Sequence, residues 1–236
     1  MADQLFVSEL QARLDTRWMG RILEIHQTID STNTRAVALA RMGSASGAVV
    51  LAEHQTEGRG RLGRRWHAPA GSALLMSVIL RPNLAPPQAQ RATMICSLAA
   101  VEAIEKTCGL HALVKWPNDI VMGGKKLAGM LAELGLRGGA LDYVVVGLGL
   151  NVNLDPAALP EAMTPPTSLQ AELGHPVSRV DLLVSLLQSM ERLCDRMAGG
   201  WSPHEMWRNY LVTLGQRVRV GAPDEVIEGL AEDVDQ

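Results

Sequence analysis

Residues 58–66, GRGRLGRRW, hold the densest group of chemically useful side chains in this sequence, with four arginines and three glycines in nine positions. Glycines let the backbone approach a ligand closely, and planar guanidinium groups bind phosphate or carboxylate oxygens through two parallel hydrogen bonds. The segment therefore predicts a binding loop for an anionic ligand, although a solvated basic loop has the same composition. Trp66 favours the binding loop, because an aromatic ring beside arginines can stack on a nucleobase.

The glycines of this loop also match a dinucleotide-binding pattern, since Gly58, Gly60 and Gly63 satisfy G-x-G-x-x-G. That pattern requires a helix directly after the loop, because the helix N-terminus holds the pyrophosphate. Here residues 67–72, HAPAGS, lead into a predicted strand instead. A nucleotide-binding oxidoreductase is therefore a disfavoured alternative from a different class of protein.

A second cationic position lies in residues 115–119, KWPND, where a short predicted strand ends. Pro117 fixes the local backbone and interrupts strand pairing, which presents Lys115 and Asp119 at a bend. A lysine held on rigid elements can neutralise charge that develops on a phosphoryl group. The alternative is a surface lysine on an edge strand.

Two further segments combine strand character with residues suited to binding. In residues 125–131, KKLAGML, Gly129 indicates either the close approach of a ligand or a β-bulge. Asn151 and Asn153 follow a strand-like run, and an amide there can recognise an adenine edge or form a turn. The six histidines show no pair at metal-ligand spacing, so no metal ligand is assigned.

The elements that position these segments favour an α+β fold with a mixed or antiparallel sheet. Glycine pairs at 123–124 and 138–139 predict two consecutive hairpins, because primed turns need the positive φ that glycine adopts freely. Consecutive hairpins disfavour a doubly wound parallel sheet. Residues 54–71 and 155–167 are predicted as loops, and long loops inside a compact domain are usually functional. Apolar patterns predict strands at 22–29, 48–53, 73–80, 215–221 and 224–234, and helices after Asp30 or Ser31, after Pro86, after Ser178 and around Trp207.

The bulk composition is that of a globular protein with one sizeable core, since 47% of the 236 residues are hydrophobic and 20% are charged. The net charge of −3 gives no whole-chain reason to expect a nucleic-acid partner. Cys96, Cys108 and Cys194 lie far apart in segments predicted as helices, so we expect reduced thiols in the cytoplasm. No secretory signal and no uninterrupted apolar run of about 18 residues stands in the sequence, so no membrane insertion is expected.

Taken in order, five segments resemble the biotin protein ligase family. They are DSTN at 30–33, AEHQTEGRGRLGRRW at 52–66, KWPND at 115–119, KLAGML at 126–131 and GLGLNVN at 147–153. The likeness extends from about Ile22 to the last residue. It implies a catalytic domain over residues 1–213 that is related to class II aminoacyl-tRNA synthetases, with a central mixed sheet. Residues 214–236 would be the start of a small, incomplete SH3-like β domain. The resemblance is to the monofunctional form, without an N-terminal winged helix-turn-helix.

The resemblance also implies a reaction. Biotin's carboxylate attacks the α-phosphate of ATP, which travels with Mg²⁺, and the resulting biotinyl-adenylate reacts with a lysine of a biotin carboxyl carrier protein or domain. A monomer or homodimer without nucleic-acid or membrane partners is expected. Lys115 and Arg61 are the expected catalytic residues. The expected biotin-binding residues are Ser31, Thr32, Gln55, Gly58, Arg59, Lys115, Gly129 and Leu131, and the expected adenylate-binding residues are Arg59, Arg61, Trp66, Lys115 and Asn151.

Other functions remain open from the residues. A lipoate or octanoate ligase or transferase of the same superfamily shares the adenylation fold, but such enzymes lack the pairing of GRGRxGR with KWPND. A biotin-responsive regulator without enzyme activity would bind biotin and ATP and label no acceptor.

Overall fold

The computed structural model describes residues 4–159, 164–221 and 226–235. Within these residues, seven strands form one sheet in the order β1-β2-β3-β7-β6-β5-β4. β1 and β2 are parallel, and every other neighbouring pair is antiparallel, so the predicted mixed sheet is confirmed. The strands are β1 (Leu23–His26), β2 (Val49–Ala52), β3 (Ala73–Leu80), β4 (Leu113–Lys115), β5 (Asp119–Met122), β6 (Lys125–Arg137) and β7 (Ala140–Asn151).

Both predicted hairpins are present, and glycines make their turns. Gly123 and Gly124, between β5 and β6, have φ of 54° and 78°, and Gly138 and Gly139, between β6 and β7, have φ of 59° and 83°. These values lie in the left-handed region that glycine adopts without steric cost. The first strand is shorter than predicted, because residues 22–29 pair as β1 over Leu23–His26 alone, with Ile29 forming an isolated bridge to Gln55.

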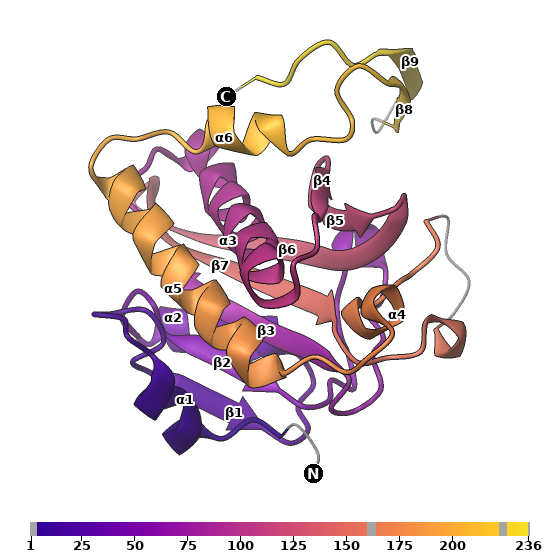
Figure 1. Cartoon of the computed structure of the whole chain (residues 1–236). Coiled ribbons are helices and arrows are strands. Elements are labelled where there is room, and N and C mark those ends of the chain that lie inside the picture. The colour runs from indigo at the N-terminus through magenta and orange to yellow at the C-terminus, as the bar shows by residue number, and fades with distance from the viewer. Residues whose placement is uncertain (1–3, 160–163, 222–225, 236) are drawn as a thin grey trace.

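One face of the sheet carries the main hydrophobic core. Two long helices, α3 (Gln90–Cys108) and α5 (Arg179–Ala198), cover this face (Figure 1). α3 ends at Gly109, which has φ of 67°, and α5 begins at Ser178, whose hydroxyl accepts a hydrogen bond from Asp181 N at 3.1 Å. Both helix boundaries agree with the sequence signals. Cys96, Cys108 and Cys194 are free thiols on these helices.

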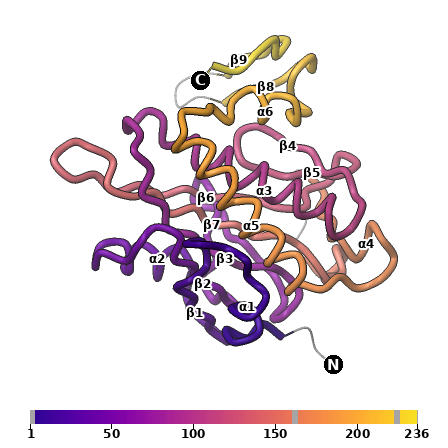
Figure 2. The backbone as a smooth tube through the Cα atoms, turned by 60° about the vertical axis from the view of Figure 1, so that its left-hand side comes forward, coloured from indigo at the N-terminus to yellow at the C-terminus, as the bar shows by residue number. Residues whose placement is uncertain are grey.

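In the part of the chain that the structure describes, a single helix, α2 (Thr32–Arg41), packs on the opposite face (Figure 2). Its Ala36 and Ala40 lie in a small core with residues of β2, β3 and β7, including Val50, Ile79 and Val145. Ser31 holds the N-cap position of α2, but its side chain makes no capping bond there. α2 covers only part of this face, so the rest is left for the loop of residues 53–72 and for a cavity.

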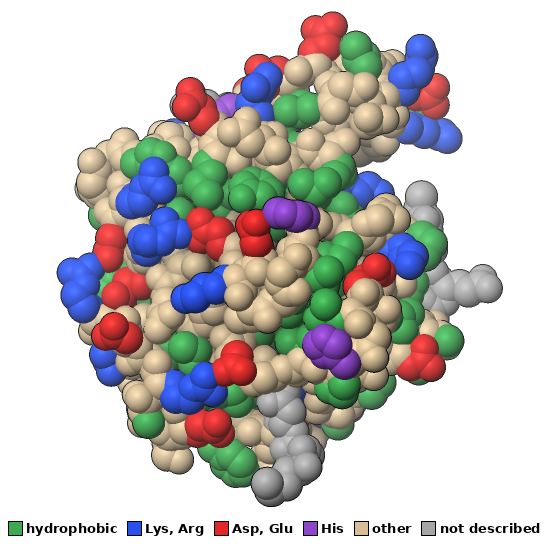
Figure 3. All heavy atoms as spheres, viewed as in Figure 1, with side chains coloured by type: hydrophobic (Ala, Val, Ile, Leu, Met, Phe, Trp, Pro, Cys, Tyr) green, Lys and Arg blue, Asp and Glu red, His purple; other side chains and the backbone are tan. Residues whose placement is uncertain are grey.

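The C-terminal part is a two-stranded sheet of β8 (Arg217–Gly221) and β9 (Val226–Leu230). A space-filling view shows this hairpin standing off the main body across a hollow (Figure 3). The start of the predicted strand at 224–234 and residues 160–163 of the predicted loop at 155–167 lie outside the described residues.

The shorter elements are α1 (Val7–Arg13), α4 (Leu169–Leu173), α6 (His204–Asn209) and the 3-10 turns at Arg61–Gly63, Pro86–Gln88 and Pro156–Ala158. α1 was not predicted from the sequence. In the described part of the chain, no helix has the length and apolar character that a bilayer crossing requires.

Candidate functional site

The main cavity lies on the sheet face that α2 leaves uncovered and has a volume of about 990 Å³. It brings together segments that are far apart in the sequence. All but one of the predicted site residues line it: Ser31, Thr32, Gln55, Arg59, Arg61, Trp66, Lys115, Gly129, Leu131 and Asn151. Gly58 lines a smaller adjoining pocket of about 500 Å³, on the side of the same loop that faces Glu133.

Glycines of β6 and β7 form the floor of the cavity. The sheet register pairs Gly129 with Gly149 and Leu131 with Gly147. A Cβ atom on Gly149 would overlap the indole of Trp66, and one on Gly147 would overlap the amide of Asn33. These two glycines therefore serve close side-chain packing on a strand. They do not form part of a dinucleotide-binding turn.

One end of the cavity is a network of neutral polar side chains. Gln55 Oε1 accepts hydrogen bonds from Thr32 N at 2.7 Å and Thr32 Oγ1 at 3.1 Å. Ser77 Oγ lies 2.8 Å from Thr32 Oγ1 and 2.6 Å from Asn33 Oδ1, and its single proton serves one of them at a time. Thr32, Asn33 and Ser77 are buried, so the network is fixed before any ligand arrives.

Residues 58–66 form a compact loop over the cavity. Trp66 N donates to Gly58 O at 2.9 Å, and Gly60 N donates to Arg64 O at 2.7 Å. Leu62, at the tip, has φ of 57° and is 87% exposed. The next regular element after the loop is β3, and no helix intervenes in this described stretch, so the geometry of a dinucleotide-binding motif is absent here.

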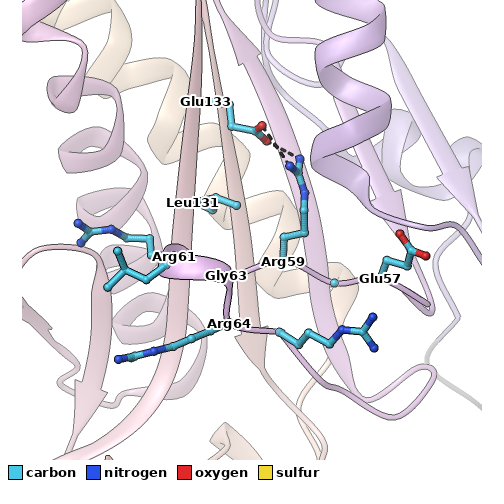
Figure 4. A pocket seen from close by; sticks show the side chains of 11 residues that line it. Glu57, Arg59, Arg61, Gly63, Arg64, Leu131 and Glu133 are labelled. Carbon is cyan, nitrogen blue, oxygen red and sulfur yellow. Dashed lines mark hydrogen bonds and ion pairs between the residues drawn. The ribbon is translucent and has the colours of Figure 1, made fainter.

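The loop arginines differ in their contacts (Figure 4). Arg59 extends toward Glu133 and donates through Nη2 at 2.6 Å and Nη1 at 3.2 Å. Arg61 points to the other side and donates to Asn118 Oδ1 at 3.1 Å. Lys115 reaches the same cavity from β4 and donates to Thr164 Oγ1 at 3.2 Å. Arg61 and Lys115 therefore have only neutral partners among the described residues.

The cavity is strongly basic although the chain is acidic overall. Among the described residues that line it, eight are Lys or Arg and one, Asp119, is acidic. Asp119 forms an ion pair with Lys126 at 2.7 Å, so the net excess of positive charge remains. Two of the eight cations, Arg217 and Arg219, come from β8 of the C-terminal hairpin. Such a concentration of cations favours a ligand with several negative charges.

Two residues that line the cavity each carry a buried polar atom without a hydrogen-bond partner among the described residues: Asn151 Oδ1 and Trp66 Nε1. Asn151 is only 2% exposed, and its Nδ2 donates to Thr167 O at 2.9 Å. Buried polar atoms are normally hydrogen-bonded. Both atoms are covered, and Trp66 Nε1 lies against β7, 2.6 Å from the position that a Cβ on Gly149 would take, so a ligand reaches them only if these side chains move.

Several residues at or beside the cavity were not predicted as site residues. Asn33 and Lys126 line the cavity, Glu133 lines the adjoining pocket, and Ser77 is buried next to Asn33. Only Asn33 and Lys126 stand within sequence segments singled out for chemistry, and Ser77 had a local signal of another kind. It is a polar residue in the centre of an apolar strand, which indicates a specific hydrogen-bond partner.

Comparisons with known proteins agree on one family. Residues 25–151 match the Biotin/lipoate A/B protein ligase family. The bifunctional ligase/repressor BirA of Bacillus subtilis is 33% identical over 98% of this chain and 72% of its own length. The biotin–[acetyl-CoA-carboxylase] ligase of Paracoccus denitrificans is 35% identical over 86% of this chain and 84% of its own. The solved structure of the biotin protein ligase from Aquifex aeolicus in complex with biotin and ATP has a TM-score of 0.75 and 27% identity, covering 91% of this chain and 88% of that one.

Proposed function

The chain belongs to the biotin/lipoate A/B protein ligase family, and from this premise we propose that it is an ATP-dependent biotin protein ligase. The enzyme joins biotin and ATP as biotinyl-5′-AMP and then transfers the biotinyl group to a lysine of an acceptor protein. The observation that carries the proposal is the convergence of Arg61 and Lys115 on one basic cavity with a glycine floor. The ligases named above, one of them solved with biotin and ATP, support it.

The first step requires two anions to meet. A carboxylate oxygen of biotin attacks the α-phosphorus of ATP, and the bond from that phosphorus to the bridging oxygen of pyrophosphate breaks. Arg61 and Lys115 reduce the repulsion, because cations fixed before the reaction stabilise charge on the transferring phosphoryl group without reorganising. Lys115 bridges the carboxylate and the α-phosphate, and Arg61 holds the phosphate from the loop.

The two ends of the adenylate occupy different surfaces of the cavity. Ser31, Thr32 and Gln55 hydrogen-bond the ureido ring of biotin at the neutral polar end. Arg59, Gly129 and Leu131 belong to the lining of the same cavity, and Gly58 to that of the adjoining pocket. Trp66 and Asn151 receive adenine, a base that carries both donors and acceptors. The place of both residues in the lining of one cavity supports this assignment.

Mg²⁺ enters as part of the substrate Mg-ATP. No group of three His, Cys, Asp or Glu side chains suited to a metal occurs among the described residues. Mg²⁺ commonly keeps several waters and is held mainly by substrate phosphates, so this basic cavity fits a metal that arrives on the nucleotide.

In the second step the acceptor lysine attacks the acyl carbon of the mixed anhydride, and AMP leaves. The acceptor is a carboxyl carrier domain of a biotin-dependent carboxylase, as the names of the relatives indicate for those proteins. The net charge of −3 favours a protein over a nucleic acid as the partner of this chain. The reaction takes place in the cytoplasm, where ATP is available and free thiols stay reduced.

Pyrophosphate exchange into ATP, measured with biotin, lipoate and octanoate in turn, tests the proposal. Exchange with biotin, followed by a biotinyl mass increment on one lysine of a carboxyl carrier domain, is expected. If exchange occurs with lipoate or octanoate and not with biotin, that acid and not biotin is the substrate. Binding of biotin and ATP without any labelled acceptor would make the protein a regulator.

A further inference from the structure

Glu133 is the one acidic side chain among the described residues of the adjoining pocket that contacts an arginine of residues 58–66. It stands on β6, beyond the glycine floor, and its two carboxylate oxygens accept hydrogen bonds from the two terminal nitrogens of Arg59. The side chains of Glu133 and Arg59 are 32% and 41% exposed, so solvent screens the attraction between their charges. The pair therefore contributes little to the free energy of unfolding and acts mainly by fixing an orientation. A bidentate pair fixes the direction of the guanidinium and therefore the path of the loop that carries it.

The same carboxylate also holds Asn33. Asn33 Nδ2 donates to Glu133 Oε2 at 2.9 Å and to Leu131 O at 3.1 Å, while its Oδ1 accepts from Ser77. The contacts of Ser77 continue to Thr32 and Gln55. A continuous chain of polar contacts thus runs from the neutral end of the cavity, through Glu133, to the basic loop.

The other loop contacts show why an anchor at this point matters. The bonds between Gly58 and Trp66 and between Gly60 and Arg64 lie within the loop and fix its shape without attaching it to the sheet. Among the described residues, the polar side-chain attachments of residues 58–65 are the Arg59 pair and the bond from Arg61 to Asn118, while Trp66 packs on the sheet at the end of the loop. Arg61 is expected to turn to phosphate when ATP binds, which leaves the Arg59 pair as the polar anchor of the loop beside the packing of Trp66.

We propose that Glu133 is a positioning residue for adenylation, and that Arg59 acts with it as a strut that sets the loop, leaving Arg61 and Lys115 to contact the phosphate. This inference rests on the proposed ligase function. It assigns the two loop arginines different roles, because the guanidinium of Arg59 pairs with a carboxylate, whereas that of Arg61 donates to an amide and has no acidic partner among the described residues.

The test is a double-mutant cycle with Glu133→Gln, Arg59→Gln and the double variant, measured by biotin-dependent pyrophosphate exchange. The Glu133→Gln side chain keeps an oxygen for Asn33 and loses the charged bidentate acceptor. If the pair is a strut, each single change lowers kcat/KM for ATP about 10-fold and the double variant is no worse than either, because both remove one interaction. Arg59→Lys, which keeps a cation opposite Glu133, should recover part of the loss.

The opposite result has a clear signature. If Arg59 leaves Glu133 to bind phosphate, Glu133→Gln frees it, and KM for ATP falls or stays unchanged while Arg59→Gln still raises it. That pattern overturns the strut. The matched control is the cycle of Arg192→Gln and Glu102→Gln, an ion pair between α5 and α3 far from the cavity, which should leave KM for ATP unchanged.

The proposed function and the strut fail in different ways. Absence of biotin-dependent exchange in the unmodified protein refutes the function. Normal exchange there, together with unaltered kinetics in Glu133→Gln, refutes only the strut. Thermal unfolding midpoints of all variants accompany the kinetics, and a specific rise in KM for ATP at an unchanged midpoint is the expected result, because a general loss of structure would move both.

Discussion

The indole ring of Trp66 lies directly on the backbone of Gly149, the central glycine of the cavity floor. Gly129, its neighbour across the sheet, leaves room for the same ring, since a Cβ there would lie 3.1 Å from Trp66 Cζ3. On another side, Lys126 Nζ is 5.8 Å from the centre of the ring. The last residue of the basic loop therefore packs on the sheet, and its ring fits there because Gly149 and Gly129 have no Cβ atoms.

Gly149→Ala should displace this ring. Alanine is tolerated by the strand backbone, but its Cβ would overlap a rigid indole that cannot yield like a flexible side chain. We expect KM for ATP to rise about 10-fold with a smaller change in biotin affinity, because the ring lies at the proposed adenine end. Steady-state exchange kinetics and biotin binding by calorimetry measure the two effects.

Gly229→Ala in β9 is the control for Gly149→Ala. It is also a strand glycine, and no heavy atom lies within 4 Å of the position that its Cβ would take. If both substitutions affect KM for ATP equally, the seat of Trp66 has no role in nucleotide binding.

Lys115→Met should separate binding from chemistry. Methionine keeps most of the length and apolar surface of lysine and removes the charge that is proposed to bridge the two reacting anions. A cation used mainly in the transition state lowers kcat on removal by roughly 100-fold or more, while biotin affinity changes little. Single-turnover adenylation and equilibrium biotin binding make the comparison, and parallel losses in both would assign Lys115 to substrate binding alone.

The parts of the sheet that depend on neighbouring residues in the chain were predictable from the sequence. Gly123 with Gly124, and Gly138 with Gly139, predicted both hairpins, because their φ requirement depends on neighbours in the chain. The alternation of residues 22–29 predicted too long a strand, because pairing partners decide where a strand ends and β2 offers only four.

That the site residues meet at one cavity was predictable from the sequence only in part. The composition of residues 58–66 and of KWPND indicated cations for an anionic ligand, and the structure brings Arg61 and Lys115 to one cavity. Arg59 and Glu133 are 74 positions apart in the sequence, and no local sequence pattern indicates that they are in contact. Trp66 was predicted to stack on a base, which remains a prediction, whereas its seat on Gly149 depends on three-dimensional packing alone.

Glu191 should make stability depend on pH. Burial alone would raise the pKa of this carboxyl, but the backbone N–H groups of Met19, Arg17 and Trp18 donate to it and hold the pKa below its ordinary value of 4.5. A depressed pKa contributes stability that is present above the unfolded pKa and is lost as pH falls through the folded value. Glu191→Gln should therefore cost about 1–3 kcal/mol of unfolding free energy at pH 7.

Urea unfolding at pH 7 and at several values below 4.5 checks this prediction. The difference between Glu191→Gln and the unmodified protein should shrink as the pH falls, because the native carboxylate becomes protonated. Glu205→Gln, at an exposed glutamate on α6, is the control and should show little difference at any pH. A gap that stays constant with pH would assign the loss to packing and not to charge.

Breaking the ion pair of Glu53 and Arg179 by replacing one of the two residues should lower the free energy of unfolding strongly. Both residues are buried, at 6% and 2% exposure, and Arg179 Nη1 lies 2.7 Å from Glu53 Oε2. The carboxylate also accepts from Leu5 N at 3.1 Å, and Arg179 donates to Ala73 O at 3.2 Å, so the pair joins the N-terminal segment, β3 and α5. Arg179→Met leaves a buried carboxylate without its cation, which should destabilise the protein by about 3–5 kcal/mol.

The double variant Glu53→Gln with Arg179→Met tests the physical cause of that loss. It removes both charges, so it should be less destabilised than Arg179→Met alone, because an uncompensated buried charge costs more than a neutral pair of side chains. Arg192→Met breaks the partly exposed pair with Glu102 and should cost below about 1 kcal/mol. Urea unfolding at pH 7 ranks the three variants, and a double variant less stable than Arg179→Met would mean that the hydrogen bonds of Glu53, and not its charge, hold these elements together.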